Sequence, residues 1–337
     1  MNGDKIPFVS VIVPCRNEER FIAECLESII SNDYPKERLE VLVMDGMSKD
    51  KTKEIIENVK SKNSGSGIRL IENPKIITPA AMNLGIKESN GEIIIKMDAH
   101  AVYAKDYISK CVKHLLESGA DNVGGVLKTI PAKDTLVSKA IAISLSHPFG
   151  AGASYFRIGS DKPRWVDTVA FGCYQKKTLE KLGGFDEKMA KIEDYELNSR
   201  LRKAGGKILL APDIIAYYYP SSDNLGSFFE HNFTDGIWST YSFKFGFFSL
   251  SVRHLIPLFF VLSLLLTLIL GIFFWVVRLT FDLIFLVYFI VNLYFSFRIA
   301  IQKGIKYFFV MPIVFTSRHI GYGLGSLWGI IKIILKI

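Results

Sequence analysis

Residues 93–100 read Ile93-Ile94-Ile95-Lys96-Met97-Asp98-Ala99-His100, an apolar run followed by an acid and an imidazole two residues apart. A short apolar run of this kind is typical of a buried strand in a parallel sheet. Such sheets bind their ligands at the carboxyl ends of the strands, which is where Asp98 and His100 stand. Side chains two residues apart on an extended backbone point to the same side, so both can reach one cation. The stretch therefore predicts a ligand site at a strand end, with a plain solvated strand end as the alternative.

The residues around this stretch alternate between strand-like and helix-like segments. We expect strands at residues 9–14, 39–44, 68–71 and 93–97. We expect helices at residues 21–30, 51–59 and 79–88, where apolar residues recur with helical spacing. This alternation predicts an α/β fold with a mostly parallel sheet and helices on both faces.

The two parts of the chain differ in composition. Residues 254–331 are dominated by apolar blocks, and the part after residue 225 has nine Lys and Arg against three acidic residues. That part therefore carries +6 of the formal net charge of +8. A basic excess beside apolar spans indicates binding to an anionic membrane surface. The first 225 residues contain no cluster of basic residues of the kind that binds nucleic acid.

The N-terminal part has the features of a cytosolic domain. Its four cysteines, Cys15, Cys25, Cys111 and Cys173, have no metal-binding spacing and are expected to be reduced thiols. The start of the chain leads directly into a strand and lacks the apolar core of a signal peptide.

Acidic residues follow three of the expected strands, namely Glu18, Asp45 and Asp98. Neither G-x-G-x-x-G nor G-x-x-x-x-G-K-[ST] occurs, which argues against an ordinary dinucleotide or P-loop site. Carboxylates at strand ends can accept hydrogen bonds from a base or from ribose hydroxyls. For Asp45 the alternative is an Asx turn or a helix cap, because Asp45-Gly46 and Ser48 are good turn and cap residues. Asp98 with His100 suits Mn²⁺ or Mg²⁺, with diphosphate oxygens completing the shell.

A second acidic group lies further along the chain. A tight turn is expected at Gly183-Gly184-Phe185-Asp186-Glu187, and Glu193-Asp194 then opens a helix that Gly205-Gly206 ends. Acids at a helix start can be plain caps that the helix dipole favours. A general base that takes a proton from a sugar hydroxyl also needs such a rigid position.

Taken in order, these motifs resemble the family 2 inverting glycosyltransferases of GT-A fold. The resemblance covers residues 8–220 and rests on Ser10-Val11-Ile12-Val13-Pro14-Cys15-Arg16-Asn17-Glu18, Asp45-Gly46-Met47-Ser48-Lys49-Asp50, Ala81-Met82-Asn83-Leu84-Gly85, Asp98-Ala99-His100, Gly183-Gly184-Phe185-Asp186-Glu187 and Glu193-Asp194. Three stretches are similar to membrane-bound bacterial enzymes of succinoglycan-type exopolysaccharide synthesis. These are Met97-Asp98-Ala99-His100-Ala101, His147-Pro148-Phe149-Gly150 and Asp194-Tyr195-Glu196-Leu197.

The resemblance implies a role for each matching residue. The nucleotide-sugar site would contain Pro14, Arg16, Glu18, Asp45, Asn83 and Asp98, with Asp45 on the base and Asp98 facing ribose and diphosphate. The metal ligands would be Asp98 and His100. His100 stands where the family usually has a second aspartate, and a neutral imidazole brings no negative charge, so the choice between Mn²⁺ and Mg²⁺ stays open. Asp194 would be the catalytic base that deprotonates the acceptor hydroxyl in one inverting displacement.

The resemblance also implies a reaction type. No Q-x-x-R-W motif of processive synthases follows Asp194, so transfer of one sugar is favoured over processive synthesis. The donor would be a nucleotide-diphosphate sugar, with uridine favoured. A membrane scaffold that has lost its chemistry remains an alternative. A sugar-nucleotide pyrophosphorylase is disfavoured because no Gly-rich loop follows the first strand, and a transporter would need more membrane spans.

The C-terminal part predicts a membrane domain. Residues 256–277 and 283–300 are apolar enough to cross a bilayer, and residues 307–331 either cross or lie at the interface because Arg318-His319 interrupts them. Basic residues at 298–306 place that loop in the cytoplasm. Aromatic and basic residues at 226–253 suit the headgroup level and would bring the cleft close to a lipid-linked acceptor.

We therefore expect three parts: a cytosolic catalytic domain at residues 1–225, an aromatic-basic interface segment at 226–253 and a membrane domain at 254–337. The protein would be a multi-pass protein of the cell membrane that contacts membrane lipids and no nucleic acid. Its oligomeric state is left open by the sequence.

Overall fold

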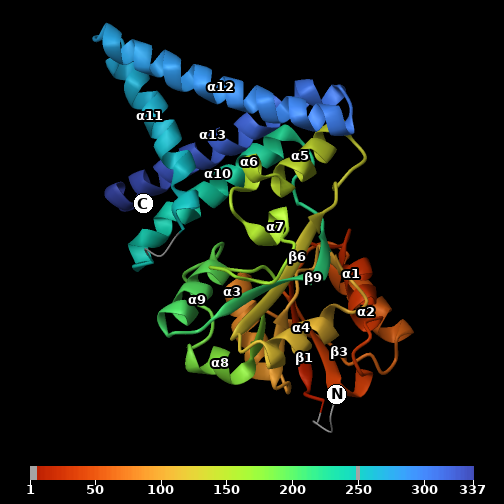
Figure 1. Ribbon diagram of the computed structural model, residues 1–337. Coiled ribbons are helices and arrows are strands. Elements are labelled where there is room, and N and C mark those ends of the chain that lie inside the picture. Colours follow the sequence, from red (N-terminus) through yellow and green to blue (C-terminus); the bar gives the residue numbers. More distant parts are fainter. Residues whose placement is uncertain (1–5, 248–250) are drawn as a thin grey trace. The chain divides into compact units, whose positions relative to one another are not determined.

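The computed structural model describes residues 6–247 and 251–337, so Phe248 of the expected interface segment lies outside the described residues. The chain forms two compact units. The sheet unit contains the residues up to Lys128 and Tyr155–Tyr219, and the helical unit contains Thr129–Ser154 and Pro220–Ile337 (Figure 1). Composition placed a boundary at residue 225, close to the last of these crossings, but it did not indicate that residues 129–154 group with the C-terminal helices.

The sheet unit is built on four parallel strands in the order β3-β2-β1-β4. They are β1 (Val9–Cys15), β2 (Leu39–Asp45), β3 (Ile68–Glu72) and β4 (Ile93–Lys96). All residues of β2 and β4 are buried, as expected for strands that helices cover on both faces. The parallel register puts Ile12 opposite Lys96, so the carboxyl ends of β1 and β4 meet at one edge.

Beyond β4 the sheet continues in the order β8-β6-β9-β5, and β7 pairs with β9. Strand β8 is antiparallel to β4 and β6, and β9 is antiparallel to β5 and β7. These strands are β5 (Ala101–Tyr103), β6 (Asn122–Thr129), β7 (Arg164–Trp165), β8 (Cys173–Gln175) and β9 (Ile208–Tyr218). The fold is thus an α/β domain on a mixed sheet with a parallel N-terminal half.

Helices cover both faces, because alternate residues of each strand point to opposite sides. Val11 and Val13 of β1 pack with α1 (Ile22–Ile30), α2 (Thr52–Lys62) and α4 (Tyr107–Glu117). Ile12 packs in a second cluster with α3 (Thr78–Glu88), α8 (Lys176–Lys181) and α9 (Glu193–Lys203). In Figure 1, α3, α8 and α9 lie on the opposite side of the sheet from α1 and α2. The expected helices and strands of the first 100 residues are confirmed, with ends that differ by at most a few residues.

The helical unit contains six α-helices among the described residues. They are α5 (Leu136–Ser146), α6 (Pro148–Ala151), α10 (Leu225–Tyr241), α11 (Ile256–Leu270), α12 (Trp275–Lys303) and α13 (Lys306–Leu335). The backbones of α10 and α13 touch: a Cβ added to Gly325 would lie 1.9 Å from the carbonyl oxygen of Phe233. Only glycine permits this approach.

Helix α13 also holds the α5–α6 segment. Arg318 Nε donates to the Gly150 carbonyl at 2.6 Å, and His319 Nε2 lies 2.8 Å from the Phe149 carbonyl oxygen. Arg318 Nη1 further donates to Asn232 of α10 at 3.1 Å. The Arg318-His319 pair that interrupts the third apolar segment therefore binds the backbone of the His147-Pro148-Phe149-Gly150 motif.

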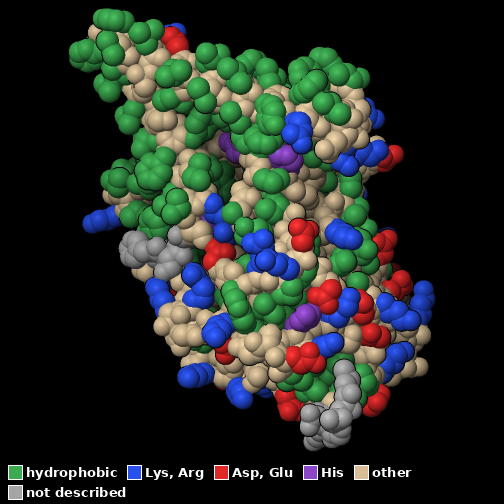
Figure 2. Space-filling model, viewed as in Figure 1, with side chains coloured by type: hydrophobic (Ala, Val, Ile, Leu, Met, Phe, Trp, Pro, Cys, Tyr) green, Lys and Arg blue, Asp and Glu red, His purple; other side chains and the backbone are tan. Residues whose placement is uncertain are grey.

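Two helical segments are long and apolar enough to cross a membrane, Val252–Leu270 and Trp275–Lys303, and only 11% and 6% of them is buried. Figure 2 shows hydrophobic side chains gathered over α11 and α12. By contrast, Met311, Val314 and Phe315 of α13 are fully buried, so this helix supplies the core of the helical unit. These properties indicate membrane association through α11 and α12.

Candidate active site

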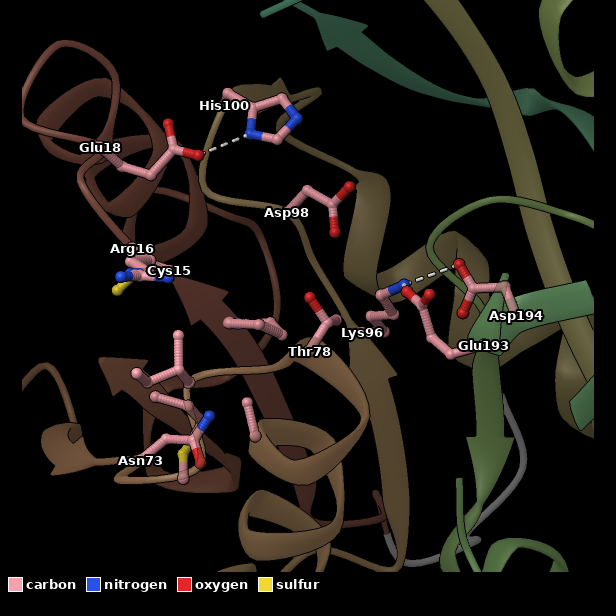
Figure 3. Close-up of a pocket in the computed structure, with 14 residues that line it drawn as sticks. Cys15, Arg16, Glu18, Asn73, Thr78, Lys96, Asp98, His100, Glu193 and Asp194 are labelled. Carbon is pink, nitrogen blue, oxygen red and sulfur yellow. Dashed lines mark hydrogen bonds and ion pairs between the residues drawn. The ribbon is translucent and has the colours of Figure 1, made fainter. Parts of the chain in front are cut away.

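A pocket of about 280 Å³ opens at the carboxyl ends of β1 and β4 (Figure 3). It is lined by Pro14, Cys15, Arg16, Glu18, Met44, Asn73, Ile76, Thr78, Ala81, Lys96, Asp98, His100, Glu193 and Asp194. Six of the eight predicted site residues belong to this set. They are Pro14, Arg16, Glu18, Asp98, His100 and Asp194.

His100 and Glu18 form one wall of the pocket. The loop after β1 is fixed by the start of α2, because Glu18 N donates to Thr52 Oγ1 at 2.8 Å. This brings Glu18 Oε1 within 2.9 Å of His100 Nδ1. Burial by itself would lower the pKa of His100, but the hydrogen bond to Glu18 and the charge of Asp98 outweigh it and raise that pKa. His100 thus carries a positive charge more readily than an ordinary histidine.

Asp98 points into the pocket between His100 and Lys96 (Figure 3). Its backbone is fixed by Tyr103, whose hydroxyl donates to the Asp98 carbonyl at 3.1 Å. Within residues 6–247 and 251–337, no group of three or more His, Cys, Asp or Glu side chains is arranged to hold a metal ion. Asp98 and His100 both line the pocket, so the pair predicted from the sequence stays together at the strand end.

The opposite wall is formed by Glu193 and Asp194 in the first turn of α9. The turn before this helix has positive φ at Gly183 and Gly184, and Arg200 of α9 donates to the Gly184 carbonyl at 2.7 Å. The last turn of α9 is therefore bound to the glycine turn that the sequence predicted. Burial raises the pKa of Asp194 to about 6, although the Lys96 ammonium pulls it down.

Lys96 connects the two acids to the sheet. Its Nζ lies 2.9 Å from Glu193 Oε1 and 2.6 Å from Asp194 Oδ2. Lys96 was not among the site residues predicted from the sequence. The available signal was its position two residues before Asp98, which places both side chains on one side of the strand end.

Two predicted residues do not line the pocket. Asp45 is fully buried and accepts a hydrogen bond from Ser48 N at 3.1 Å, which is the Asx-turn geometry offered as the alternative. Asn83 binds the glycine turn in both directions, since its Nδ2 donates to Phe185 O at 2.9 Å and Phe185 N donates to its Oδ1 at 2.8 Å. Their assignment to the nucleotide stays a prediction.

The four cysteines are free and buried. Burial is the main cause that raises the pKa of Cys15 far above its ordinary value, and the charge of Asp45 adds to it. Cys15 lines the pocket as a neutral thiol, so it is not an activated nucleophile.

Comparison with known proteins agrees with this geometry. Residues 10–179 match the family model described as glycosyl transferase family 2. The chain is 28% identical over 331 residues to the dolichyl N-acetyl-alpha-D-glucosaminyl phosphate 3-beta-D-2,3-diacetamido-2,3-dideoxy-beta-D-glucuronosyltransferase of Methanococcus voltae, covering 96% of this chain and 98% of the relative. It is 28% identical over 235 residues to the succinoglycan biosynthesis protein ExoA of Rhizobium meliloti, covering 68% and 69%.

Among solved structures, the mannosyltransferase PcManGT from Pyrobaculum calidifontis, in complex with GDP-Man and Mn²⁺, superposes with a TM-score of 0.61 at 19% sequence identity. The superposition covers 96% of this chain and 88% of that one. At this identity the likeness establishes the GT-A type of fold, including the C-terminal helices, and nothing about substrates.

Proposed function

The chain belongs to glycosyl transferase family 2 and is a glycosyltransferase of glycan and polysaccharide synthesis, and we propose that it moves one sugar from a uridine-diphosphate sugar to a lipid-linked acceptor. The observation that carries the proposal is that Asp98, His100 and Asp194 line one pocket. This arrangement supports a diphosphate site and a base for the acceptor that act on one bound donor.

In the donor half of the pocket, Arg16 and Glu18 would hold the nucleotide. Asp98 and His100 would hold Mn²⁺ or Mg²⁺, with His100 binding through Nε2 because Nδ1 faces Glu18. When bound, the ion supplies positive charge that stabilises the leaving diphosphate. Support for a metal comes from the two-ligand donor set at the strand end and from the Mn²⁺ named in the PcManGT complex.

In the acceptor half, Asp194 would act as the general base. Its side chain is 26% exposed, against 11% for Glu193, so it is the more accessible of the two acids. It would remove the proton of the acceptor hydroxyl while that oxygen attacks the anomeric carbon from the face opposite the diphosphate. The configuration at this carbon is then inverted in a single displacement.

The acceptor would be a saccharide on a polyprenyl phosphate, or the polyprenyl phosphate itself. Support comes from the Methanococcus voltae relative that matches over nearly its whole length, because its name specifies a dolichyl-phosphate-linked acceptor. The apolar segments Val252–Leu270 and Trp275–Lys303 give further support. We propose a multi-pass protein of the cell membrane with the sheet unit in the cytoplasm. Tethering at the membrane would raise the effective concentration of a lipid substrate.

The proposal is tested with the full chain in detergent micelles that contain a polyprenyl-phosphate-linked saccharide. Nucleotide sugars are screened for nucleotide release with Mn²⁺, with Mg²⁺ and with a chelator. A donor whose nucleotide release depends on metal and rises strongly when acceptor is added, with one sugar added per acceptor, supports the proposal. Repeated addition would show processive synthesis, and no release from any donor would favour an inactive scaffold.

A further inference from the structure

Lys96 is a buried lysine that lines the pocket. It is the last residue of β4, is 3% exposed, and its backbone N donates to the Gly172 carbonyl at 3.0 Å. Burying an ammonium group is costly unless a charged partner lies within hydrogen-bond distance. The fixed backbone and the free-energy cost of burying the ammonium together indicate that the Lys96 side chain has a functional role.

Its two partners have different surroundings. Both line the pocket, but Glu193 is buried, at 8% exposure, whereas the Asp194 side chain is 26% exposed (Figure 3). One ammonium therefore binds two neighbouring carboxylates, of which Asp194 is the more accessible. Without this cation the two acids of the α9 start would repel each other, and one of them would take up a proton.

We propose that Lys96 is the positioning residue of the catalytic base: it neutralises Glu193 and holds Asp194 by Oδ2, so that Oδ1 receives the acceptor proton. The inference rests on the proposed function of the same pocket. It assigns separate roles to the two adjacent acids, with Asp194 as the base and Glu193 as the buried counter-ion that keeps Lys96 in place.

The charges around Asp194 determine how the loss of Lys96 would change the Asp194 pKa. Lys96 and Asp98 face it from the end of β4, Glu193 adjoins it on α9, and the phenol of Tyr174 on β8 interacts with it. Lys96 is the cation that lowers the Asp194 pKa, whereas the two neighbouring acids and burial raise it. Loss of one close opposite charge raises a carboxyl pKa by about 1–3 units. The base would then be protonated at neutral pH.

The test compares Lys96→Met, Lys96→Arg and the double variant Lys96→Met with Glu193→Gln in the full chain. For each, kcat and KM are measured from about pH 5 to about pH 9, together with the Kd for UDP. In Lys96→Met we expect kcat at pH 7 to fall about 2- to 100-fold and the acid limb of the profile to move up by about 1–3 pH units, with the Kd for UDP within about threefold.

The other two variants act as matched controls. Lys96→Arg keeps the charge, so its acid limb should stay near that of the unmodified protein even if kcat falls through altered geometry. The double variant removes one charge of each sign, so its acid limb should return to within about one pH unit. It also answers the question if Lys96→Met alone fails to fold, because a buried ion pair tolerates joint replacement better than loss of one partner.

An unmoved acid limb in Lys96→Met would overturn the inference, and so would a loss of UDP affinity that accounts for the whole loss of rate. The second result would make Lys96 a donor-binding residue. An acid limb in the double variant that stays as high as in Lys96→Met would overturn the role of Glu193. A failure of the proposed function is distinct, because the unmodified protein would then transfer no sugar from any donor.

Discussion

Removing the C-terminal helices tests which parts of the chain can fold alone. A cut after Tyr219 leaves the residues of the two sheet-unit clusters in place, including Val11 and Ile12 on the two sheet faces. It also leaves residues 129–154 attached, although their packing partners are gone. We expect this truncated chain to aggregate, and we expect a second version without residues 129–154 to be soluble and to bind UDP.

The magnitude follows from the cluster around α5. Its buried residues are Ala140, Ile141, Leu145, Phe228, Ile299, Tyr307, Met311, Val314 and Phe315, and only the first three precede the cut. Exposing a large aliphatic side chain costs about 1.5–3 kcal/mol, so Ile141 and Leu145 together lose about 3–6 kcal/mol. That is comparable to the whole stability of many domains, so α5 cannot keep its fold and presents apolar surface.

The assay is gel filtration of both versions followed by UDP binding and donor hydrolysis. In the second version, a flexible Gly/Ser linker of about twelve residues joins Lys128 to Tyr155. The second version should elute as one species, bind UDP and hydrolyse donor slowly, yet fail to transfer sugar to a lipid-linked acceptor. If the first version is equally well behaved, the reasoning about α5 is wrong. If both are folded but neither binds UDP, the helical unit completes the donor site.

Further predictions concern single positions. Because burial raises the pKa of Asp194 to about 6, kcat/KM should fall as the pH drops below about 6, where the base becomes protonated. Asp194→Asn should reduce transfer by about 10² or more with UDP binding kept, and near-normal turnover would leave Asp194 as a helix cap only. His100→Ala should weaken the Mn²⁺ dependence of UDP binding and His100→Asp should restore it, whereas an unchanged Mn²⁺ titration in His100→Ala would remove His100 from the coordination shell. Asn83→Ala should lower the free energy of unfolding, measured with denaturant, by about 1–3 kcal/mol because its hydrogen bonds to Phe185 are lost. A loss of UDP affinity without a loss of stability would instead make Asn83 a nucleotide-binding residue. Gly325→Val should destabilise the helical unit in a thermal assay in detergent, because its Cβ would overlap the Phe233 carbonyl, and an unchanged melting temperature would contradict the close approach of the two helices.

The sequence by itself determined the parallel half of the sheet and one end of the site. Apolar runs of four to seven residues alternate there with amphipathic helices. The spacing of apolar residues predicts these helices and strands, and the ends of the strands predict the edge of the sheet that binds ligands. Asp98 and His100 were identified for the same reason, because a spacing of two residues on a strand end is a local property. Asp194 came from order and resemblance, with a helix start that the local pattern also predicts.

Tertiary structure decided the rest because the interactions concerned are long-range. The antiparallel strands β5, β7 and β8 have three residues or fewer, too short for any alternation to register. Lys96 meets Asp194 across 98 residues, and Glu18 meets His100 across 82, so neither pairing leaves a periodic trace in the sequence. Asp45 and Asn83 match the family motifs as Asp98 does. In the folded chain, however, Asp45 accepts a hydrogen bond in an Asx turn and Asn83 binds the Phe185 backbone. The Arg318-His319 pair interrupts an apolar segment in the sequence. In the folded helical unit it donates to the Gly150 and Phe149 carbonyls, about 170 residues earlier in the chain, which no local pattern predicts.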